Sequence, residues 1–326
     1  MNTHKEFSDF NSKVRLAQSK RGKLKSHRKS LRQRIRDHFA KEGWSKPLFA
    51  SQGSFPLQTN VNPIRTYDDS GDPIEEYDLD DGVYFICPLE ERETAKTYHD
   101  RLLAAVDGHT NKSAEGRTSC VRVIYHDGHH VDLPVYWSDG ETEVPQIGRP
   151  GQGYSVSDPK SFKEWVNGRI EVTDHVGQLR RVIRYLKAWK NYRETNVEGL
   201  ELPPGVTLTI LACRHFVEND RDDVSFRETV RAIANSLKVS FTCYRPTTPT
   251  HEDLLENFNR EAVLAELDRI VSHADEAESS DSKREAREQW REVFGDRFPK
   301  GEDTSQKALA APYVQTTTAN KPWGKG

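Results

Sequence analysis

Apolar residues recur at helical spacing through the N-terminal part of the chain. They would form a single stripe along a helix and are Phe10, Val14, Leu24, Leu31, Ile35 and Phe39. Gly43 follows the stripe, and glycine commonly ends a helix. The pattern predicts one long helix over residues 6–41.

The middle of the chain alternates between apolar and polar residues, as strands do. Residues 77–87 predict one strand. Two further alternating runs, residues 119–125 and 129–137, flank Asp127-Gly128, a dipeptide typical of tight β-hairpin turns. Pro134 lacks a backbone donor, which predicts that the second arm of this hairpin is an edge strand or ends there.

Two shorter elements complete this part of the chain. Residues 59–75 predict a hairpin or lid whose turn is Asp68–Pro73, because Asp, Ser, Gly and Pro gather there. Residues 91–107 carry apolar positions at helical spacing and predict a helix.

From residue 174 onward the pattern is helical. Helices are expected through Val176–Trp189 and over residues 207–217, 223–238, 252–273 and 281–294. Trp165, Trp189 and Trp290 fall at helical spacings and are expected in the core. The order of elements predicts an α+β fold with an active site between two lobes. We expect residues 1–172 to form the mixed core, 173–298 a helical lobe and 299–326 a disordered tail.

Composition narrows the class of protein. Charged residues make up 30% of the 326 residues and the mean hydropathy is −0.83. No run approaches the roughly 20 apolar residues of a membrane span, and the first residues lack the apolar segment of a signal peptide. The four cysteines are far apart in sequence, which favours a reducing compartment over a disulfide framework or zinc ribbon. We therefore expect a cytoplasmic protein without membrane contact.

Positive charge is concentrated near the N-terminus. Residues 13–36 contain many Lys and Arg but no Asp or Glu. We interpret this run as the solvated face of a helix. A surface that binds nucleic acid or another polyanion is the alternative.

Three carboxylates and a Gly-Ser turn form the candidate catalytic constellation. Asp78 and Asp80 are two residues apart in a predicted strand, so both side chains project from one face, about 7 Å apart. Asp132 lies in the second arm of the predicted hairpin. Gln52-Gly53-Ser54-Phe55 is a turn of the kind that offers backbone N–H groups to phosphate. Together these residues predict metal-assisted phosphoryl or nucleotidyl transfer.

Carboxylates suit Mg²⁺, which is hard and is held by a few acids together with substrate phosphates. We predict that Asp78, Asp80 and Asp132 bind two Mg²⁺ ions, with Mn²⁺ as a substitute. Zinc bound by His126, His129, His130 and Asp132 is a weaker alternative, because histidines on a hairpin turn are ordinarily exposed. The Gly-rich segment 148–154 lacks the Lys-Ser/Thr of a P-loop.

These motifs resemble those of the bacterial cGAS/DncV-like nucleotidyltransferases (CD-NTases), within the polymerase-β-like superfamily. Three segments are especially similar to the DncV-like branch: residues 52–55, 77–84 and 131–136. Two later segments, residues 181–190 and 289–299, resemble the helical lobe of that family. The resemblance covers about residues 5–299 and implies a polymerase-β-like core beside a helical lobe.

The resemblance also implies an activity and residue roles. Members join ATP, GTP or both into a cyclic di- or trinucleotide that activates an effector in anti-phage defence. Gln52, Gly53 and Ser54 would hold the donor triphosphate, helped by Lys187 or Lys190; Thr207 is the nearest hydroxyl for a further phosphate contact. In related enzymes a ubiquitin-transfer-like (E1/E2-like) partner conjugates the C-terminal residue, which here is Gly326.

The chain departs from the family just after the Gly-Ser turn. Pro56-Leu57 stands where an aromatic residue could stack on a base, so stacking is assigned instead to Tyr154 or Tyr185. Two other functions remain open. One is a nucleotidyltransferase that modifies an antibiotic, a protein or an RNA end; the other is a non-catalytic nucleic-acid-binding protein that uses the basic helix.

Overall fold

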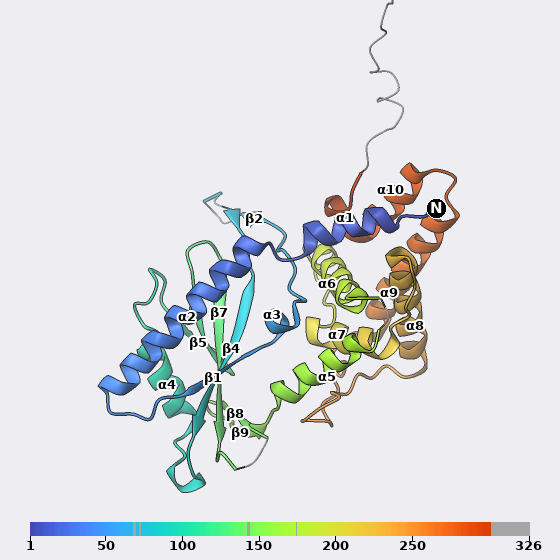
Figure 1. Ribbon diagram of the computed structural model, residues 1–326. Helices are drawn as coiled ribbons and strands as arrows, with labels where there is room; N and C mark the ends of the chain where they lie inside the picture. The colour runs from blue at the N-terminus through green and yellow to red at the C-terminus, as the bar shows by residue number, and fades with distance from the viewer. Residues whose placement is uncertain (68–69, 72, 142–143, 174, 301–326) are drawn as a thin grey trace, which may run out of the picture.

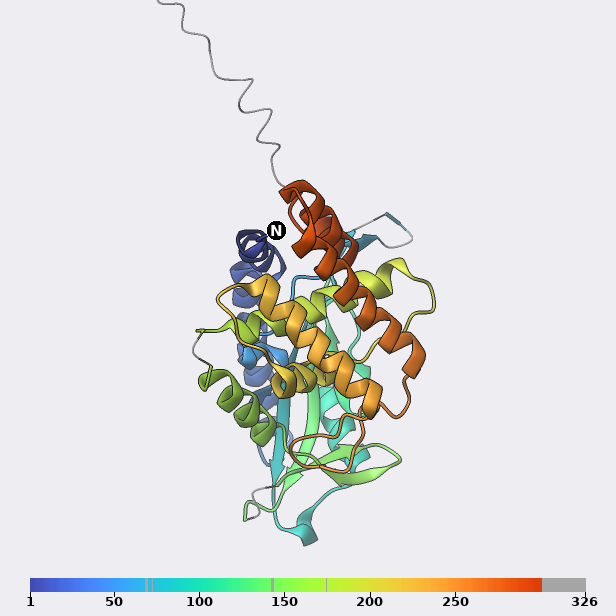
Figure 2. The same ribbon diagram turned by 90° about the vertical axis from the view of Figure 1, so that its right-hand side faces the viewer.

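The computed structural model describes residues 1–300 except 68–69, 72, 142–143 and 174. A sheet-containing lobe and a helical lobe lie side by side (Figure 1), and Figure 2 looks onto the helical lobe with the sheet lobe behind it. The α+β prediction is therefore confirmed. No helix in the described ranges is both long enough and apolar enough to cross a membrane. The predicted tail lies outside these ranges from residue 301 onward, and so does Gly326.

A twisted mixed sheet forms the first lobe. Its strands are, in spatial order, β1 Leu48–Gln52, β4 Asp78–Ile86, β7 His130–Ser138, β6 Cys120–Ile124 and β5 Glu115–Gly116. β8 Gln146–Arg149 pairs with β7, and β9 Gly153–Val156 pairs with β8. β4 and β7 run parallel, whereas β1 and β6 flank them in antiparallel orientation. A separate pair, β2 Thr66–Tyr67 and β3 Pro73–Ile74, supports the predicted hairpin; parts of its turn lie outside the described residues.

Helices cover one face of this sheet. α2 Gln18–Lys41 crosses it diagonally beside α4 Ala95–Val106 (Figure 1). The apolar stripe of α2 belongs to one buried cluster with Leu79, Val83 and Phe85 of β4. Because side chains alternate along a strand, Asp78 and Asp80 lie on the opposite face. The packing of α2 therefore fixes the direction in which the candidate acids point.

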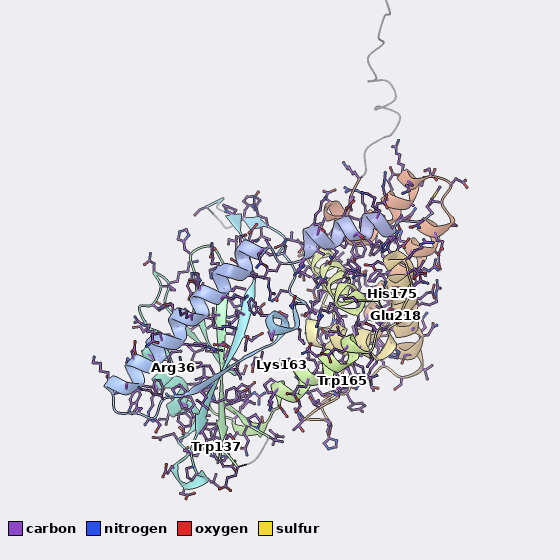
Figure 3. The ribbon with its side chains drawn as sticks, in the orientation of Figure 1. Arg36, Trp137, Lys163, Trp165, His175 and Glu218 are labelled. Atoms are coloured by element: carbon purple, nitrogen blue, oxygen red, sulfur yellow. The ribbon has the colours of Figure 1, made fainter. Side chains whose placement is uncertain are left out.

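The second lobe is a bundle of helices. They are α1 His4–Val14, α5 Pro159–Glu171, α6 Gln178–Asn196, α7 Gly205–His215, α8 Asp222–Val239, α9 Arg260–Ser279 and α10 Lys283–Phe294. A short 3₁₀ segment, Gly295–Arg297, follows α10, and another, Leu89–Glu91, lies between β4 and α4 in the sheet lobe. Trp189 and Trp290 are buried here as predicted, and Trp165 of α5 is partly buried (Figure 3). The helix predicted over residues 252–273 begins only at Arg260.

The single long N-terminal helix is a wrong prediction. The chain forms α1 and α2, with an extended Arg15 between them that bridges to Val61. Phe7 and Phe10 of α1 pack in the core of the helical lobe, whereas the stripe of α2 packs on the sheet. The break is needed because one straight helix could not bury two stripes against two different lobes. The division at residue 172 stays a prediction of domain organisation, although α1 and α5 pack with the helical cluster.

The predicted hairpin around Asp127-Gly128 is confirmed, but its second arm is not an edge strand. β7 lies in the interior of the sheet, between β4 and β6. Its pairing with β4 covers Asp80–Asp132 and resumes at Val83–Val135, beyond Pro134. The proline is accommodated at this interruption of the ladder, so it does not end the strand.

Most basic side chains of α2 hold the helix to its own lobe. Lys20 and Lys23 pair with Glu75 and Asp127. Others donate to oxygens beneath the helix: Arg21 to Phe55, Arg28 to Ser51 and Arg34 to Ala105. The interpretation as a solvated face therefore holds only in part: Lys25 and Lys29 are exposed, but several other basic side chains are bonded within the lobe.

The strongest of these contacts joins Arg32 to Asp81. The Asp81 carboxylate is fully buried and accepts from Nε and Nη2 of Arg32 at 2.6 and 2.5 Å. We predict that Arg32→Met lowers the free energy of unfolding by about 3 kcal/mol, because a buried carboxylate loses its partner. Urea unfolding measures this. Arg36→Met is the matched control: Arg36 lies one turn further along α2 (Figure 3), and its guanidinium lies over the ring of Phe49. An equal loss in both variants would contradict the prediction.

Candidate active site

A cavity of about 640 Å³ lies between the lobes. The sheet lobe contributes Gln52, Gly53, Ser54, Asp78 and Asp80 to its lining; the helical lobe contributes Lys187, Lys190, Asn191 and Gly205. Its size is that of a small-molecule site, and its position is the predicted interlobe cleft. The cavity therefore brings together the Gly-Ser turn, the first two acids and both candidate lysines.

The Gly-Ser turn touches one of the acids directly. Gln52 pairs with Asp80 across β1 and β4, and Gly53 follows with φ +69° and precedes the short α3 Ser54–Leu57. A Cβ atom on Gly53 would lie 2.1 Å from Oδ2 of Asp80. Any other residue would have to displace this carboxylate, so the site requires glycine here. Ser54 is held as well, since its Oγ accepts from Nδ2 of Asn60 at 2.6 Å.

Strand register aligns the three acids. β4 and β7 pair Asp78 with His130 and Asp80 directly with Asp132. Burial raises the pKa of Asp80 well above its ordinary value, and the negative charges of Asp78 and Asp132 raise it further. The negative charge around Asp80 is thus incompletely compensated by nearby cations. A bound divalent cation would reduce the repulsion between these carboxylates.

Asp132 already has a cationic partner that the sequence analysis missed. Its carboxylate accepts from Nε and Nη2 of Arg122 on β6, both at 2.8 Å, and Nε2 of His130 lies 3.9 Å away. The hairpin register opposes Arg122 to Asp132, so counting outward from the Asp127-Gly128 turn would have found the pair. Within the described residues, no three His, Cys, Asp or Glu side chains are gathered closely enough to hold a metal ion.

The pairing of Arg122 with Asp132 affects the magnesium prediction, and the surroundings of His129 affect the zinc alternative. The three acids are hard oxygen donors on one face and fit Mg²⁺ by chemistry, but a cation would have to share Asp132 with Arg122. The zinc alternative gains no support. His129 is buried, contrary to the expected exposure, and hydrogen-bonds to Asp127 and to His27, 2.8 Å away.

The two candidate lysines differ in their partners. Nζ of Lys187 donates to O and Oγ1 of Thr59 at 3.4 and 3.3 Å, whereas Lys190 is paired with Glu194. Burial lowers the pKa of Lys187 to about 8, although Asp78 and Asp80 oppose the shift. Lys187 is therefore the lysine whose charge is available near the acids.

Other predicted contacts are not brought to the cavity. Thr207 is fully buried within α7, where Pro204 rather than Thr207 is the N-cap, and Thr209 lines the cavity instead. Tyr185 is fully buried and its hydroxyl donates to Asp222, so it cannot stack on a base. Tyr154 donates to the Glu93 carbonyl and is not among the lining residues. The aromatic residues that line the cavity are Tyr77, Tyr136 and Phe162.

Comparison with known families agrees with this geometry. Residues 47–136 match the family model described as cyclic GMP-AMP synthase DncV-like, nucleotidyltransferase domain. That range holds the Gly-Ser turn and all three acids. The predicted family resemblance and the prediction of a nucleotidyltransferase are confirmed.

Curated relatives are similar over much of the chain. The cyclic GMP-AMP synthase of Vibrio cholerae serotype O1 is 26% identical over 85% of this chain and 73% of that protein. The synthase of Escherichia albertii is also 26% identical, over 61% of this chain and 44% of that protein. The match thus spans less than half the length of the second relative.

Solved structures share the fold. Vibrio cholerae DncV in complex with ATP, GTP and 5MTHFGLU2 has a TM-score of 0.75 at 19% identity, covering 91% of this chain and 97% of that one. Escherichia coli DncV in its 3′-deoxy GTP bound form has a TM-score of 0.70 at 20% identity, covering 88% and 93%. At such identities the likeness establishes a shared fold alone.

The crowding of carboxylates predicts an effect on stability. Because the folded state raises the pKa of Asp80, it binds more protons than the unfolded state between the two pKa values. The free energy of unfolding therefore falls as pH rises through that window. Asp80→Asn removes this loss, and we predict a Tm at least about 2 °C above that of the unchanged chain at pH 7 without metal.

Thermal unfolding from pH 4 to pH 8 measures this difference, which should shrink toward acid pH. Asp100→Asn is the control, since Asp100 is exposed on α4 and pairs with Lys96. A Tm for Asp80→Asn at or below that of the unchanged chain at pH 7 would contradict the prediction.

Proposed function

We propose that this chain is a member of the bacterial cGAS/DncV-like nucleotidyltransferases and that it makes a cyclic di- or trinucleotide from ATP, GTP or both. One observation carries the proposal most directly. The phosphate-binding turn at Gly53 contacts Asp80 within a cavity that also receives Lys187 from the other lobe. Such an arrangement brings a triphosphate and its metal-binding acids to the same place.

Relatives support the choice of substrates. One Vibrio cholerae DncV structure is in complex with the linear intermediate 5′ pppA(3′,5′)pG and another with ATP and GTP. The curated relatives are named cyclic GMP-AMP synthases. A purine dinucleotide product is therefore the first candidate for this chain.

We assign roles to residues as follows. Asp78, Asp80 and Asp132 would hold two Mg²⁺ ions, for which Mn²⁺ substitutes; Mg²⁺ would neutralise phosphate charge and activate the attacking hydroxyl. Gln52, Gly53 and Ser54 would bind the donor triphosphate together with Lys187. Arg122 donates to both oxygens of Asp132, so a metal ion would share this carboxylate with the guanidinium.

The wider setting is also a proposal from the family resemblance. The product would activate an effector in bacterial anti-phage defence. An E1/E2-like partner would conjugate Gly326, and the enzyme would act in the cytoplasm. Thr207 and Lys190 are the less favoured phosphate contacts, since Thr207 lies off the cavity and Lys190 is paired with Glu194.

The central test needs nucleotides alone. We predict that the chain, all four NTPs and Mg²⁺ give a phosphatase-resistant cyclic product detectable by mass spectrometry. The double variant Asp78→Asn/Asp80→Asn and the single variant Asp132→Asn should each reduce it at least about 100-fold, because the metal ligands are lost. Asp100→Asn on α4 is the control and should keep full activity.

Other outcomes of the same assay would favour the alternatives. A product that forms only with an added antibiotic, protein or RNA would indicate a modifying transferase. Salt-dependent binding of nucleic acid without NTP turnover would indicate a binding protein. Retained cyclic product in Asp132→Asn would contradict the residue assignment.

A second test separates the two lysines. Lys187→Met should weaken ATP binding about tenfold at pH 7, because one charge-assisted contact to phosphate is lost. In the unchanged chain, affinity should fall as pH rises through about 8, where Lys187 loses its proton, and this dependence should vanish in Lys187→Met. Isothermal titration calorimetry measures both effects.

Lys190→Met is the control. It should change affinity less than about threefold, since Glu194 already holds that ammonium. A larger loss of affinity in Lys190→Met than in Lys187→Met would refute the assignment.

A further inference from the structure

A short segment behind the Gly-Ser turn joins the two lobes. We call residues 58–62 the strap; they follow α3 and run beside the break between α1 and α2. Backbone bonds fix the strap to that break, from Leu16 N to Asn60 O at 3.4 Å and from Asn62 N to Val14 O at 2.7 Å. Thr59 and Asn60 of the strap line the cavity.

The strap begins with an unfavourable backbone conformation. Gln58 has φ +59° and ψ +32°, and it is the one non-glycine residue with positive φ in the described part of the chain. L-residues avoid this left-handed region because Cβ approaches the following carbonyl oxygen. Such conformations persist only where the surroundings hold them.

A buried arginine holds this residue. Arg184 of α6 is 5% exposed, and its Nη1 donates to the Gln58 carbonyl at 2.8 Å. Its Nε and Nη2 donate to Oδ1 of Asn11 at 3.0 and 2.8 Å. Among the described residues, the hydrogen-bond acceptors of Arg184 are the amide oxygen of Asn11 and the carbonyl of Gln58, and no carboxylate pairs with its guanidinium. Burying a charge in this way is costly and suggests a purpose beyond packing.

The next two residues of the strap contact side chains of the candidate active site. Directly after Gln58, Thr59 accepts from Nζ of Lys187 through both O and Oγ1. The next residue, Asn60, donates from Nδ2 to Oγ of Ser54 at 2.6 Å. Lys187 and Ser54 belong to different lobes, yet both are oriented by consecutive residues of one turn.

We propose that Arg184 is a positioning residue for triphosphate binding. By holding the left-handed Gln58, it sets Thr59 and Asn60 so that Lys187 and Ser54 meet the same phosphate chain. The inference rests on the proposed function for the identity of the ligand. Arg184 itself contacts no substrate in this assignment.

A double-mutant cycle tests the link between Arg184 and Gln58. The probe is inorganic tripolyphosphate, titrated calorimetrically at a fixed Mg²⁺ concentration. Arg184→Met should weaken binding about tenfold, because the strap relaxes from the left-handed turn. Gln58→Gly should change binding less than about twofold, since glycine adopts positive φ without strain.

The double variant Arg184→Met/Gln58→Gly gives the decisive reading. If Arg184 acts by holding the backbone of Gln58, glycine should restore most of the lost affinity. Asn11→Ala is the matched control: it removes the other acceptor of Arg184 but leaves the Gln58 contact, so binding should stay within about twofold of the unchanged chain.

Two results would overturn the inference while leaving the proposed function intact. One is a double variant that binds as weakly as Arg184→Met. The other is a loss in Asn11→Ala as large as that in Arg184→Met. If Arg184→Met does not fold, Arg184→Lys with and without Gln58→Gly takes its place under the same criteria. Failure of the unchanged chain to bind tripolyphosphate at all would overturn the proposed function together with this inference.

Discussion

The parallel pairing of β4 with β7 is the constraint on which the site depends. It sets Asp80 opposite Asp132 in register, while α2 on the far face fixes which side chains point to the cavity. The antiparallel pairing of β1 then brings Gln52 beside Asp80, so that the next residue, Gly53, can touch its carboxylate. Without those three neighbouring strands the acids would have neither alignment nor the Gly-Ser turn beside them.

Charge is balanced unevenly across this sheet. On the face under α2, Asp81 is neutralised by Arg32 and the lobe is held together. On the cavity face, Arg122 pairs with Asp132. The carboxylates of Asp78 and Asp80 repel each other, and burial of Asp80 strengthens this repulsion. This is the pattern expected where stability is given up for a ligand that brings positive charge.

Local sequence patterns predicted the helices and strands better than the contacts between them. The strand carrying Asp78 and Asp80 and the hairpin carrying Asp132 could be predicted because alternation and an Asp-Gly turn are signals within a few residues. The contact of Gly53 with Asp80 could not, since it depends on pairing between segments almost thirty residues apart. The long helix failed for a related reason: periodicity shows that a stripe exists, but not which surface it meets. For the lysines, a usable signal was present, because Glu194 stands four residues after Lys190, the spacing of a helical ion pair.

The break between α1 and α2 also shapes how the chain can fold. The helical lobe takes its first helix from the start of the sequence and the rest from beyond residue 158, so the entire sheet lobe is an insertion within it. The rings of Phe7 and Phe294 pack with centroids 5.8 Å apart although 287 positions separate them. During synthesis Phe7 therefore stays unburied until Phe294 has been made. The sheet lobe is free to close earlier, which makes a late-forming helical core, with its high contact order, the vulnerable stage of biogenesis.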